Sequence, residues 1–247
     1  MVCPSRNGQR QDCQGGVAVK NSVPIYRNKN RDIVAVVTEK SVNRKIGDMA
    51  QLSVMVDSVS PVLALRGQDS KICGDCPLRP SKVGGCYVTV ARFAQAVWRS
   101  VKGQAVVNTW ATTKPIRLGA YGDPAMLPVP LLAKLTKGRK HTGYTHQWRK
   151  VAPTYARYLM ASIDKLSGDV GAQITQAKAK GYRYFRVSDN GRDLRKGEIL
   201  CPNFTHGVNC ADCLLCDGSR GSKDRRKNIV IPVHGSAVRR YVDGGVA

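Results

Sequence analysis

The chain is short of acidic residues. Its 247 residues include 17 Asp and Glu against 40 Lys and Arg, which gives a formal net charge of +23. A surface that serves solubility alone usually mixes both signs, so this imbalance favours a polyanionic partner, most often a nucleic acid. The sequence also lacks any stretch of roughly 20 apolar residues, so we expect no membrane-spanning helix. Its first ten residues contain no apolar signal core. We therefore expect a cytoplasmic protein, whose thiols stay reduced.

Several catalytic and nucleotide-binding motifs are missing. There is no G-x-G-x-x-G and no Walker motif, so nucleotide binding of those two kinds is not indicated. The four histidines, His141, His146, His206 and His234, do not form the paired-histidine motif of rolling-circle nickases. The sequence alone leaves open whether the protein is an enzyme.

Cysteine is the residue type that stands out. The run at Cys201, Cys210, Cys213 and Cys216 contains the spacing C-x2-C-x2-C, which is typical of loops that wrap an iron–sulfur cluster. Zinc sites more often use C-x2-C pairs that are separated by a longer loop. The spacing therefore favours an iron–sulfur cluster, of the [4Fe-4S] type, and leaves zinc as the alternative. Two further cysteines, Cys3 and Cys13, are interpreted as plain thiols.

A second cysteine run comes earlier in the chain, with the spacing C-x2-C-x9-C at Cys73, Cys76 and Cys86. Three thiolates are one ligand short of a closed tetrahedral site. Either a fourth ligand comes from elsewhere, or one metal position stays open for a substrate, or the three share ligation with the later run. Counting cysteines does not decide between one centre and two.

Hydrophobic patterning predicts an α/β fold. Polar turns separate short apolar strands and amphipathic helices at intervals of about 20–25 residues, which is typical of repeated βα units that form a partial barrel-like parallel sheet. We expect cysteine-rich metal-binding loops on this sheet. The expected strands are 32–40, 115–120, 142–145, 159–163, 182–187 and 228–233, with 50–56 as a strand or short helix, and the expected helical segments are 87–101, 129–135, 153–158 and 169–180.

The chain divides into three expected parts. Residues 1–68 form a basic N-terminal arm and the first strands, residues 69–200 form the βα core with the first cysteine loop, and residues 201–247 hold the second cysteine run and a basic tail. Because ligand sites of such sheets lie past the carboxyl ends of the strands, the polar residues just after them are candidates for a site. These candidates are Asp123, His146, Trp148 and Asp164, although each taken alone could simply be a turn or helix-cap residue.

Basic residues gather at three places. Because phosphate contacts come mainly from Lys and Arg, these groups are the candidate nucleic-acid contacts. They are Arg27, Lys29 and Arg31, then Lys137, Arg139 and Lys140, and finally Arg225, Arg226 and Lys227.

Several motifs together resemble a known group of proteins. They are Cys-Gly-Asp-Cys-Pro-Leu-Arg with Gly-Gly-Cys-Tyr, Arg-Leu-Gly-Ala-Tyr-Gly-Asp-Pro, Thr-Gly-Tyr-Thr-His-Gln-Trp, Met-Ala-Ser-Ile-Asp, Gly-Tyr-Arg-Tyr-Phe-Arg-Val and the last cysteine run. Over residues 71–234 this order resembles a poorly characterised, cysteine-rich family of phage- and plasmid-encoded proteins, and it is distantly similar to phage proteins of the radical-SAM type. The resemblance implies a mobile-element protein in a bacterial host, with an iron–sulfur centre. It differs from typical radical-SAM enzymes, which carry C-x3-C-x2-C.

Three functions follow as hypotheses. The leading one is an iron–sulfur protein that binds nucleic acid, single-stranded DNA rather than RNA, with the cluster as a structural staple. The second is a radical-SAM-like enzyme with a non-standard cysteine motif, whose open iron would lie near Asp123, His146 and Asp164. The third is a zinc-stapled nucleic-acid-binding module.

Overall fold

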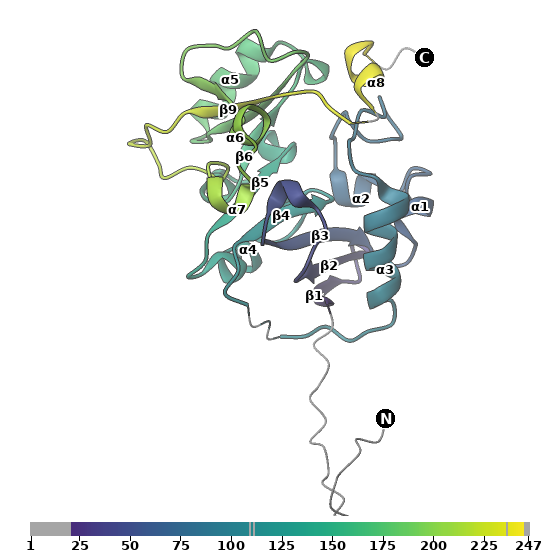
Figure 1. Ribbon diagram of the computed structural model, residues 1–247. Coiled ribbons are helices and arrows are strands. Elements are labelled where there is room, and N and C mark those ends of the chain that lie inside the picture. Colours follow the sequence, from purple (N-terminus) through teal and green to yellow (C-terminus); the bar gives the residue numbers. More distant parts are fainter. Residues whose placement is uncertain (1–20, 109, 111, 236, 245–247) are drawn as a thin grey trace, which may run out of the picture.

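A computed structural model describes residues 21–244 apart from 109, 111 and 236, so Cys3 and Cys13 lie outside the described residues. The described chain is an α/β structure with nine strands and eight α-helices (Figure 1). The strands are β1 (Ser22–Asn28), β2 (Ile33–Thr38), β3 (Ala50–Val56), β4 (Ile116–Tyr121), β5 (His141–Thr145), β6 (Met160–Ile163), β7 (Tyr184–Ser188), β8 (Glu198–Leu200) and β9 (Asn228–Pro232). The helices are α1 (Pro61–Ala64), α2 (Ser70–Cys73), α3 (Gln95–Val101), α4 (Val129–Thr136), α5 (Val170–Ala179), α6 (Pro202–His206), α7 (Cys210–Cys213) and α8 (Val238–Val242).

The strands form one mostly parallel sheet, in the order β1-β2-β3-β4-β5-β6-β7-β9-β8. Only β1 and β2 break the pattern, because β1 pairs antiparallel with β2 and β2 pairs antiparallel with β3. From β3 onward every neighbouring pair is parallel. The last strand in sequence, β9, lies between β7 and β8. All strands from β3 to β9 therefore end at one edge of the sheet.

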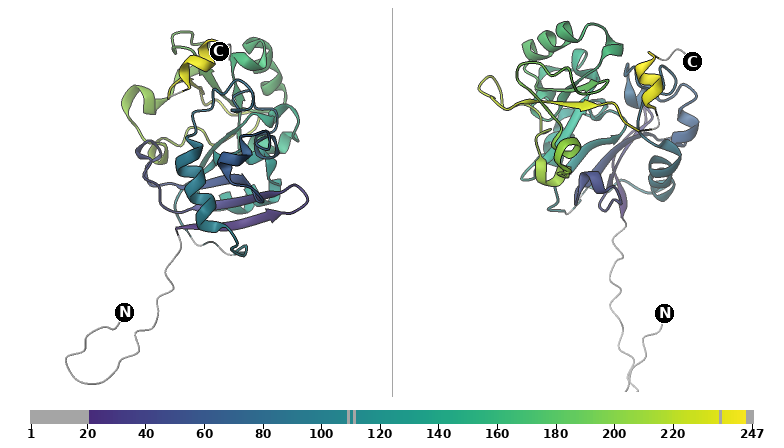
Figure 2. Two further views of the ribbon diagram at one scale, coloured as in Figure 1. Left: turned by 90° about the vertical axis from the view of Figure 1, so that its right-hand side faces the viewer. Right: turned by 45° about the horizontal axis from the view of Figure 1, so that its top comes forward.

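The first half of the sheet forms the larger core. Every residue of β2 and β3 is buried, as expected for apolar, β-branched segments in the middle of a sheet. Figures 1 and 2 show α1, α2 and α3 together beside these strands, and α3 adds Val97, Trp98 and Val101 to the core. This half therefore forms a rigid base, and the first cysteine loop starts from it after β3.

In the second half of the sheet, alternate residues of each strand face opposite sides. On one side Ala161, Ile163 and Tyr184 pack with Ile174 and Ala177 of α5. On the other side lie Met160, Phe185, Ile229 and Ile231, and the partly buried Leu215 and Cys216 pack against them. A helix thus covers one side, while the segment that carries the second cysteine run covers the other.

Most of the expected elements are confirmed within one to three residues at their ends. The segment at 50–56 is a strand, 153–158 is a 3₁₀ turn rather than an α-helix, and the helix expected at 87–101 begins as a π-helical turn at Val90. The sequence interpretation missed β1, which lies in the segment assigned to a polar arm. The βα repetition is also incomplete, because no α-helix separates β5 from β6. Within the described ranges, no helix is long and apolar enough to span a membrane.

Candidate functional site

The first cysteine loop lies at the carboxyl edge of the parallel strands. It leaves the end of β3 and passes through α2, which ends at Cys73. The backbone carbonyl of Cys73 accepts a 2.9 Å hydrogen bond from Nε2 of Gln147, just past β5, and the carbonyl of Ile72 accepts one of 2.7 Å from the backbone N–H of Asp123, just past β4. Two neighbouring strand ends therefore hold Cys73 in position.

A buried ion pair fixes the rest of this loop. Nη1 of Arg79 lies 3.0 Å from Oδ1 of Asp69, and both residues are less than a tenth exposed. The hydroxyl of Ser81 donates to the same carboxylate at 2.9 Å, and the backbone N–H of Cys86 donates to Leu78 at 2.8 Å. Since breaking a buried pair leaves an uncompensated charge, this contact strongly resists rearrangement of the loop between Cys76 and Cys86.

Cys73, Cys76 and Cys86 form the first thiol group. Burial raises the pKa of Cys73, and the neighbouring thiols of Cys76 and Cys86 and the carboxylates of Asp123 and Asp69 raise it further. Burial also raises the pKa of Cys76 and of Cys86. A metal cation would reverse this preference for the protonated form, because coordinated thiols lose their protons.

Cys201, Cys210, Cys213 and Cys216 form the second thiol group. Cys201 is the N-cap residue of α6, and Cys210 and Cys213 begin and end the single turn of α7, so they lie three residues apart on one helical face. Burial raises the pKa of Cys216, and the thiols of Cys201, Cys210 and Cys213 raise it further. The four residues thus converge despite a span of sixteen positions.

Backbone contacts anchor this second group to the sheet. The N–H of Cys201 donates to Val230 of β9, and the carbonyl of Cys216 accepts from Gly143 of β5, both at 2.8 Å. Nη1 of Arg183 donates to the carbonyls of Leu215 at 2.8 Å and Gly218 at 3.1 Å. Arg183 therefore supports the cysteine loop.

The cysteines thus fall into two groups by their place in the fold, three on the loop that follows β3 and four on the segment between β8 and β9. All seven described cysteines are free thiols. Over residues 21–244, with their three gaps, no three His, Cys, Asp or Glu side chains lie close enough to hold a single metal ion. A polynuclear cluster needs no such convergence on one point, because each of its cysteines binds a different iron.

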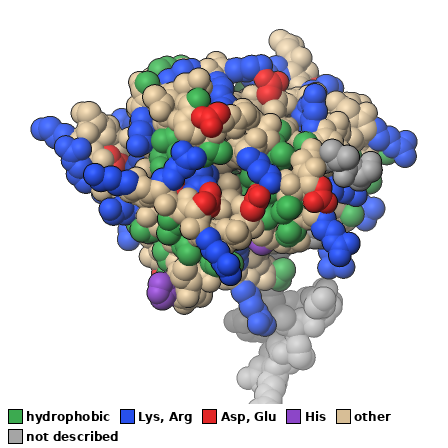
Figure 3. Space-filling model, turned by 90° about the horizontal axis from the view of Figure 1, so that it is seen from above, with side chains coloured by type: hydrophobic (Ala, Val, Ile, Leu, Met, Phe, Trp, Pro, Cys, Tyr) green, Lys and Arg blue, Asp and Glu red, His purple; other side chains and the backbone are tan. Residues whose placement is uncertain are grey.

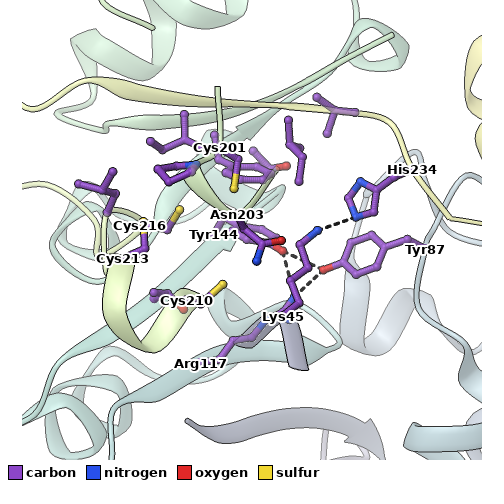
Figure 4. A pocket seen from close by; sticks show the side chains of 18 of the residues that line it. Lys45, Tyr87, Arg117, Tyr144, Cys201, Asn203, Cys210, Cys213, Cys216 and His234 are labelled. Carbon is purple, nitrogen blue, oxygen red and sulfur yellow. Dashed lines mark hydrogen bonds between the residues drawn. The ribbon is translucent and has the colours of Figure 1, made fainter. Parts of the chain in front are cut away.

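A pocket of about 200 Å³ lies beside the second group (Figure 4). All four cysteines of the second group line it, together with Leu78, Gly85 and Tyr87 from the first cysteine loop. Its floor is the side of the sheet opposite α5, where β7 and β9 contribute apolar side chains. Those side chains are Phe185, Val187, Ile229 and Ile231.

Two tyrosines and an arginine occupy the middle of this pocket. The hydroxyls of Tyr87 and Tyr144 lie 2.8 Å apart, and Nη2 of Arg117 donates to them at 2.6 and 3.2 Å respectively. Tyr144 stacks on Phe185 with a centroid separation of 4.6 Å. The sequence interpretation did not assign these three residues to a site, because they are distant in the chain: the parallel pairing of β4 and β5 brings Arg117 and Tyr144 together, and Tyr87 comes from the end of the first cysteine loop.

A lysine and a histidine lie on the same side of the pocket. Nδ1 of His234 is 3.0 Å from the carbonyl oxygen of Pro232 and donates to it. Nε2 of the same ring is therefore free to accept from Nζ of Lys45, also at 3.0 Å. Burial lowers the pKa of His234, and the cations of Lys45 and Arg117 lower it further. These effects favour the neutral form of the ring, and burial also lowers the pKa of Lys45.

Three of the four candidates at the strand ends lie together. The backbone N–H of His146 donates to Oδ2 of Asp123 at 2.8 Å, and its Nε2 lies 3.6 Å from Oδ2 of Asp164 and 3.1 Å from Oγ of Ser162. Burial raises the pKa of Asp123. His146 and Ser162 also line the pocket.

The fourth candidate, Trp148, is fully buried in the core on the other side of the sheet, where its Nε1 donates to the Ser162 carbonyl at 3.0 Å. Asp123 and Asp164 also cap the 3₁₀ turns that follow their strands. These two carboxylates therefore have a structural role whether or not they take part in chemistry.

The three basic groups do not form one surface. Ile33, just after Arg27, Lys29 and Arg31, pairs with Val56, so the first group lies at the carboxyl edge of the sheet. The other two groups directly precede β5 and β9 and therefore lie at the opposite edge. Several of the nine side chains are already engaged: Arg27 pairs with Asp57 at 2.7 Å, Arg226 pairs with Asp224 at 2.6 Å and also with Asp217, and Arg139 stacks over Trp110.

The chain matches no protein-family model, and neither a curated protein nor a solved structure is found to match it.

Proposed function

We propose that the protein carries two iron–sulfur centres, an open one at Cys73, Cys76 and Cys86 and a closed one at Cys201, Cys210, Cys213 and Cys216. The observation that carries this proposal is the separation of the thiols into a group of three, on the loop that follows β3, and a group of four, on the segment between β8 and β9. Four thiols suit a cluster with all its irons ligated, whereas three leave one iron free for another ligand.

The surroundings of both groups fit such clusters. The thiols are partly buried, and Cys201 and Cys216 pack against the apolar side chains of β6, β7 and β9. Such an apolar setting suits an iron–sulfur cluster with thiolate ligands. Zinc is the alternative occupant, and it would require four ligands to converge on one ion.

The position of the three-thiol group supports an enzyme more than a structural staple. It lies past the carboxyl ends of parallel strands, where α/β sheets generally bind their ligands, and Gln147 next to His146 holds the Cys73 carbonyl. Cys73, Cys76 and Cys86 would hold a cluster with one open iron, which once reduced would supply one electron to a ligand there. We propose that the ligand is S-adenosylmethionine: the electron would break its sulfur–C5′ bond to give methionine and a 5′-deoxyadenosyl radical, which would take a hydrogen atom from a substrate to form 5′-deoxyadenosine.

Metal analysis of anaerobically purified protein tests the two centres. Wild-type protein is expected to hold about eight irons and eight sulfides per chain. Replacing the three cysteines of the first group by alanine should remove about half, and replacing the four of the second group should remove the other half. A variant with Cys3→Ala and Cys13→Ala is the matched control and should keep all of them. Zinc in place of iron, or complete loss from either set of substitutions, would contradict the proposal.

The reaction is tested separately. Protein reduced with dithionite and mixed with S-adenosylmethionine is expected to form 5′-deoxyadenosine, and the variant without the first cysteine group should form none. If wild-type protein with intact, reduced clusters forms no 5′-deoxyadenosine, the proposed reaction is wrong while the two centres stand.

Nucleic-acid binding is the second candidate function, and the net charge of +23 favours it. On the face that Figure 3 shows, lysine and arginine side chains are spread out rather than gathered in one patch. A labelled single-stranded DNA of about 20 nucleotides should then bind with an affinity that falls steeply between 50 and 200 mM salt. Replacing Arg225 and Lys227, which are exposed and directly precede β9, by alanine should weaken binding. An affinity unchanged by salt would contradict the electrostatic argument.

A further inference from the structure

The pocket beside the second thiol group has an uneven distribution of charge. Lys45 and Arg117 line it, but no Asp or Glu does among the described residues. Within the same part of the chain, neither cation forms an ion pair with a carboxylate. Both are half-buried. Placing charge in a partly apolar pocket is costly unless an opposite charge or strong hydrogen bonds compensate it.

The partners that these two cations do have are neutral. Nζ of Lys45 donates to Nε2 of His234, and Nη2 of Arg117 donates to the hydroxyls of Tyr87 and Tyr144. Neither cation donates a hydrogen bond to a cysteine sulfur in the described structure. Lys45 and Arg117 are thus near Cys201 and Cys210 without being bonded to them, so their hydrogen-bonding capacity is available to another group.

The rest of the pocket is apolar. Phe185, Ile229 and Ile231 form its floor, and Leu78 and Leu214 line its sides. Small-molecule sites typically combine such a lining with a few convergent polar groups that fix the orientation of the ligand. We propose that this pocket binds an organic anion, with its apolar body on Phe185 and Ile231 and its carboxylate or phosphate between Lys45 and Arg117.

Charge-assisted hydrogen bonds explain why the anionic group would direct binding. A carboxylate or phosphate can accept from the Lys45 ammonium and from the guanidinium of Arg117, whose planar fork matches such oxygens. An alcohol of the same length offers the same apolar body without the charge. The anion and the alcohol should therefore differ in affinity at this site, whereas purely hydrophobic binding would scarcely separate them.

The test uses the full-length, anaerobically purified protein with its metal, and isothermal titration with octanoate, octyl phosphate and octanol. At least one of the two anions should bind about tenfold or more tightly than octanol, and the stronger anion shows which head group the site prefers. Lys45→Met should weaken binding of that anion about tenfold and leave octanol unchanged. Lys196→Met, which removes an exposed lysine outside the pocket, is the matched control and should bind all three like the wild type. Arg117→Lys, which keeps the charge, should retain part of the preference for the anion.

Several results would overturn the inference: equal affinities for the anions and octanol, an unchanged affinity in Lys45→Met, or anion binding only after the metal is removed. The last result would mean that the two cations compensate the thiol centre instead. Iron is measured in the same sample, so that a failure of the proposed clusters can be told apart from a failure of the proposed anion binding. If the protein as purified contains no iron and still binds the anion, the pocket is supported and the clusters are refuted.

Discussion

The buried ion pair between Arg186 and Glu198 offers a sharp test of how the second cysteine group is held. Nε and Nη2 of Arg186 lie 2.8 and 2.7 Å from the two carboxylate oxygens of Glu198, and the exposed fractions of the two side chains are 2% and 0%. Glu198 begins β8, three residues before Cys201. The pair therefore ties the strand that leads into the cysteine run to β7.

Glu198→Gln keeps the shape of the side chain but removes its charge. The Arg186 guanidinium then stays buried against a neutral amide, which costs about 3–5 kcal/mol in the free energy of unfolding. For a chain of this size each kcal/mol lowers Tm by roughly 2–4 °C, so a fall of about 6–20 °C is expected. Circular dichroism of the metal-loaded protein measures it, and Cys201 should hold its metal less tightly in the same variant.

The control is Asp193→Asn. Asp193 contacts the same arginine at 2.7 Å, but its side chain is 58% exposed, so solvent screening limits the loss to about 1 kcal/mol or less. If Asp193→Asn costs as much as Glu198→Gln, or if Glu198→Gln costs less than about 1 kcal/mol, burial does not determine the strength of this pair and the reasoning is wrong.

The same pair has a predictable pH dependence. Burial acts to raise the pKa of Glu198, but its hydrogen bonds with Arg186 and the Arg195 backbone outweigh burial and lower it. A carboxyl with a lowered pKa stabilises the fold above its unfolded pKa of about 4.3, and this contribution is lost as the pH falls through the folded value. The difference in the free energy of unfolding between wild type and Glu198→Gln should therefore be largest at pH 7 and decrease below about pH 4.

Two further substitutions test the fold near the first cysteine group and the strand ends. Gly74 has a φ of +54°, and a Cβ there would lie 2.3 Å from Oε1 of Gln147, so Gly74→Ala should cost more stability and more iron than Gly103→Ala, where φ is +73° but the space is open. Equal losses of stability and iron in the two alanine variants would contradict the predicted clash. Trp148→Phe leaves the buried Ser162 carbonyl without its 3.0 Å hydrogen bond and should lower the free energy of unfolding by about 1–3 kcal/mol in a denaturant titration. A loss near zero would show that the bond is replaced.

Much of the sheet could be predicted from local patterning. β2 and β3 are runs of buried apolar residues, and β4, β6 and β7 are short apolar segments with polar turns behind them, so hydrophobicity alone locates them. β1 was not predicted because Arg27 and Asn28 make its end resemble a polar arm, although the strand pairs with β2. β8 was not predicted because it has only three residues and begins with the charged Glu198.

The site could be predicted only in part. The cysteine spacing indicated which side chains gather, since Cys210, Cys213 and Cys216 are local in the chain. It could not show that Cys73, Cys76 and Cys86 stay apart from them, because that depends on where the two loops leave the sheet. Lys45 and Arg117 were missed for the same reason: their pairing with His234 and the two tyrosines depends on tertiary contacts.

The place of β9 between β7 and β8 has a consequence for how the protein matures. During synthesis β8 leaves the ribosome before β9, but among the described strands β8 has no neighbour other than β9 to pair with. The backbone hydrogen bond from Cys201 to Val230 can therefore form only after the chain has been made as far as β9, whereas Glu198 can already contact Arg186 of β7. The strand that leads into the second thiol group is thus held at first by a side-chain ion pair, and its backbone pairing in the sheet is completed by the last strand made.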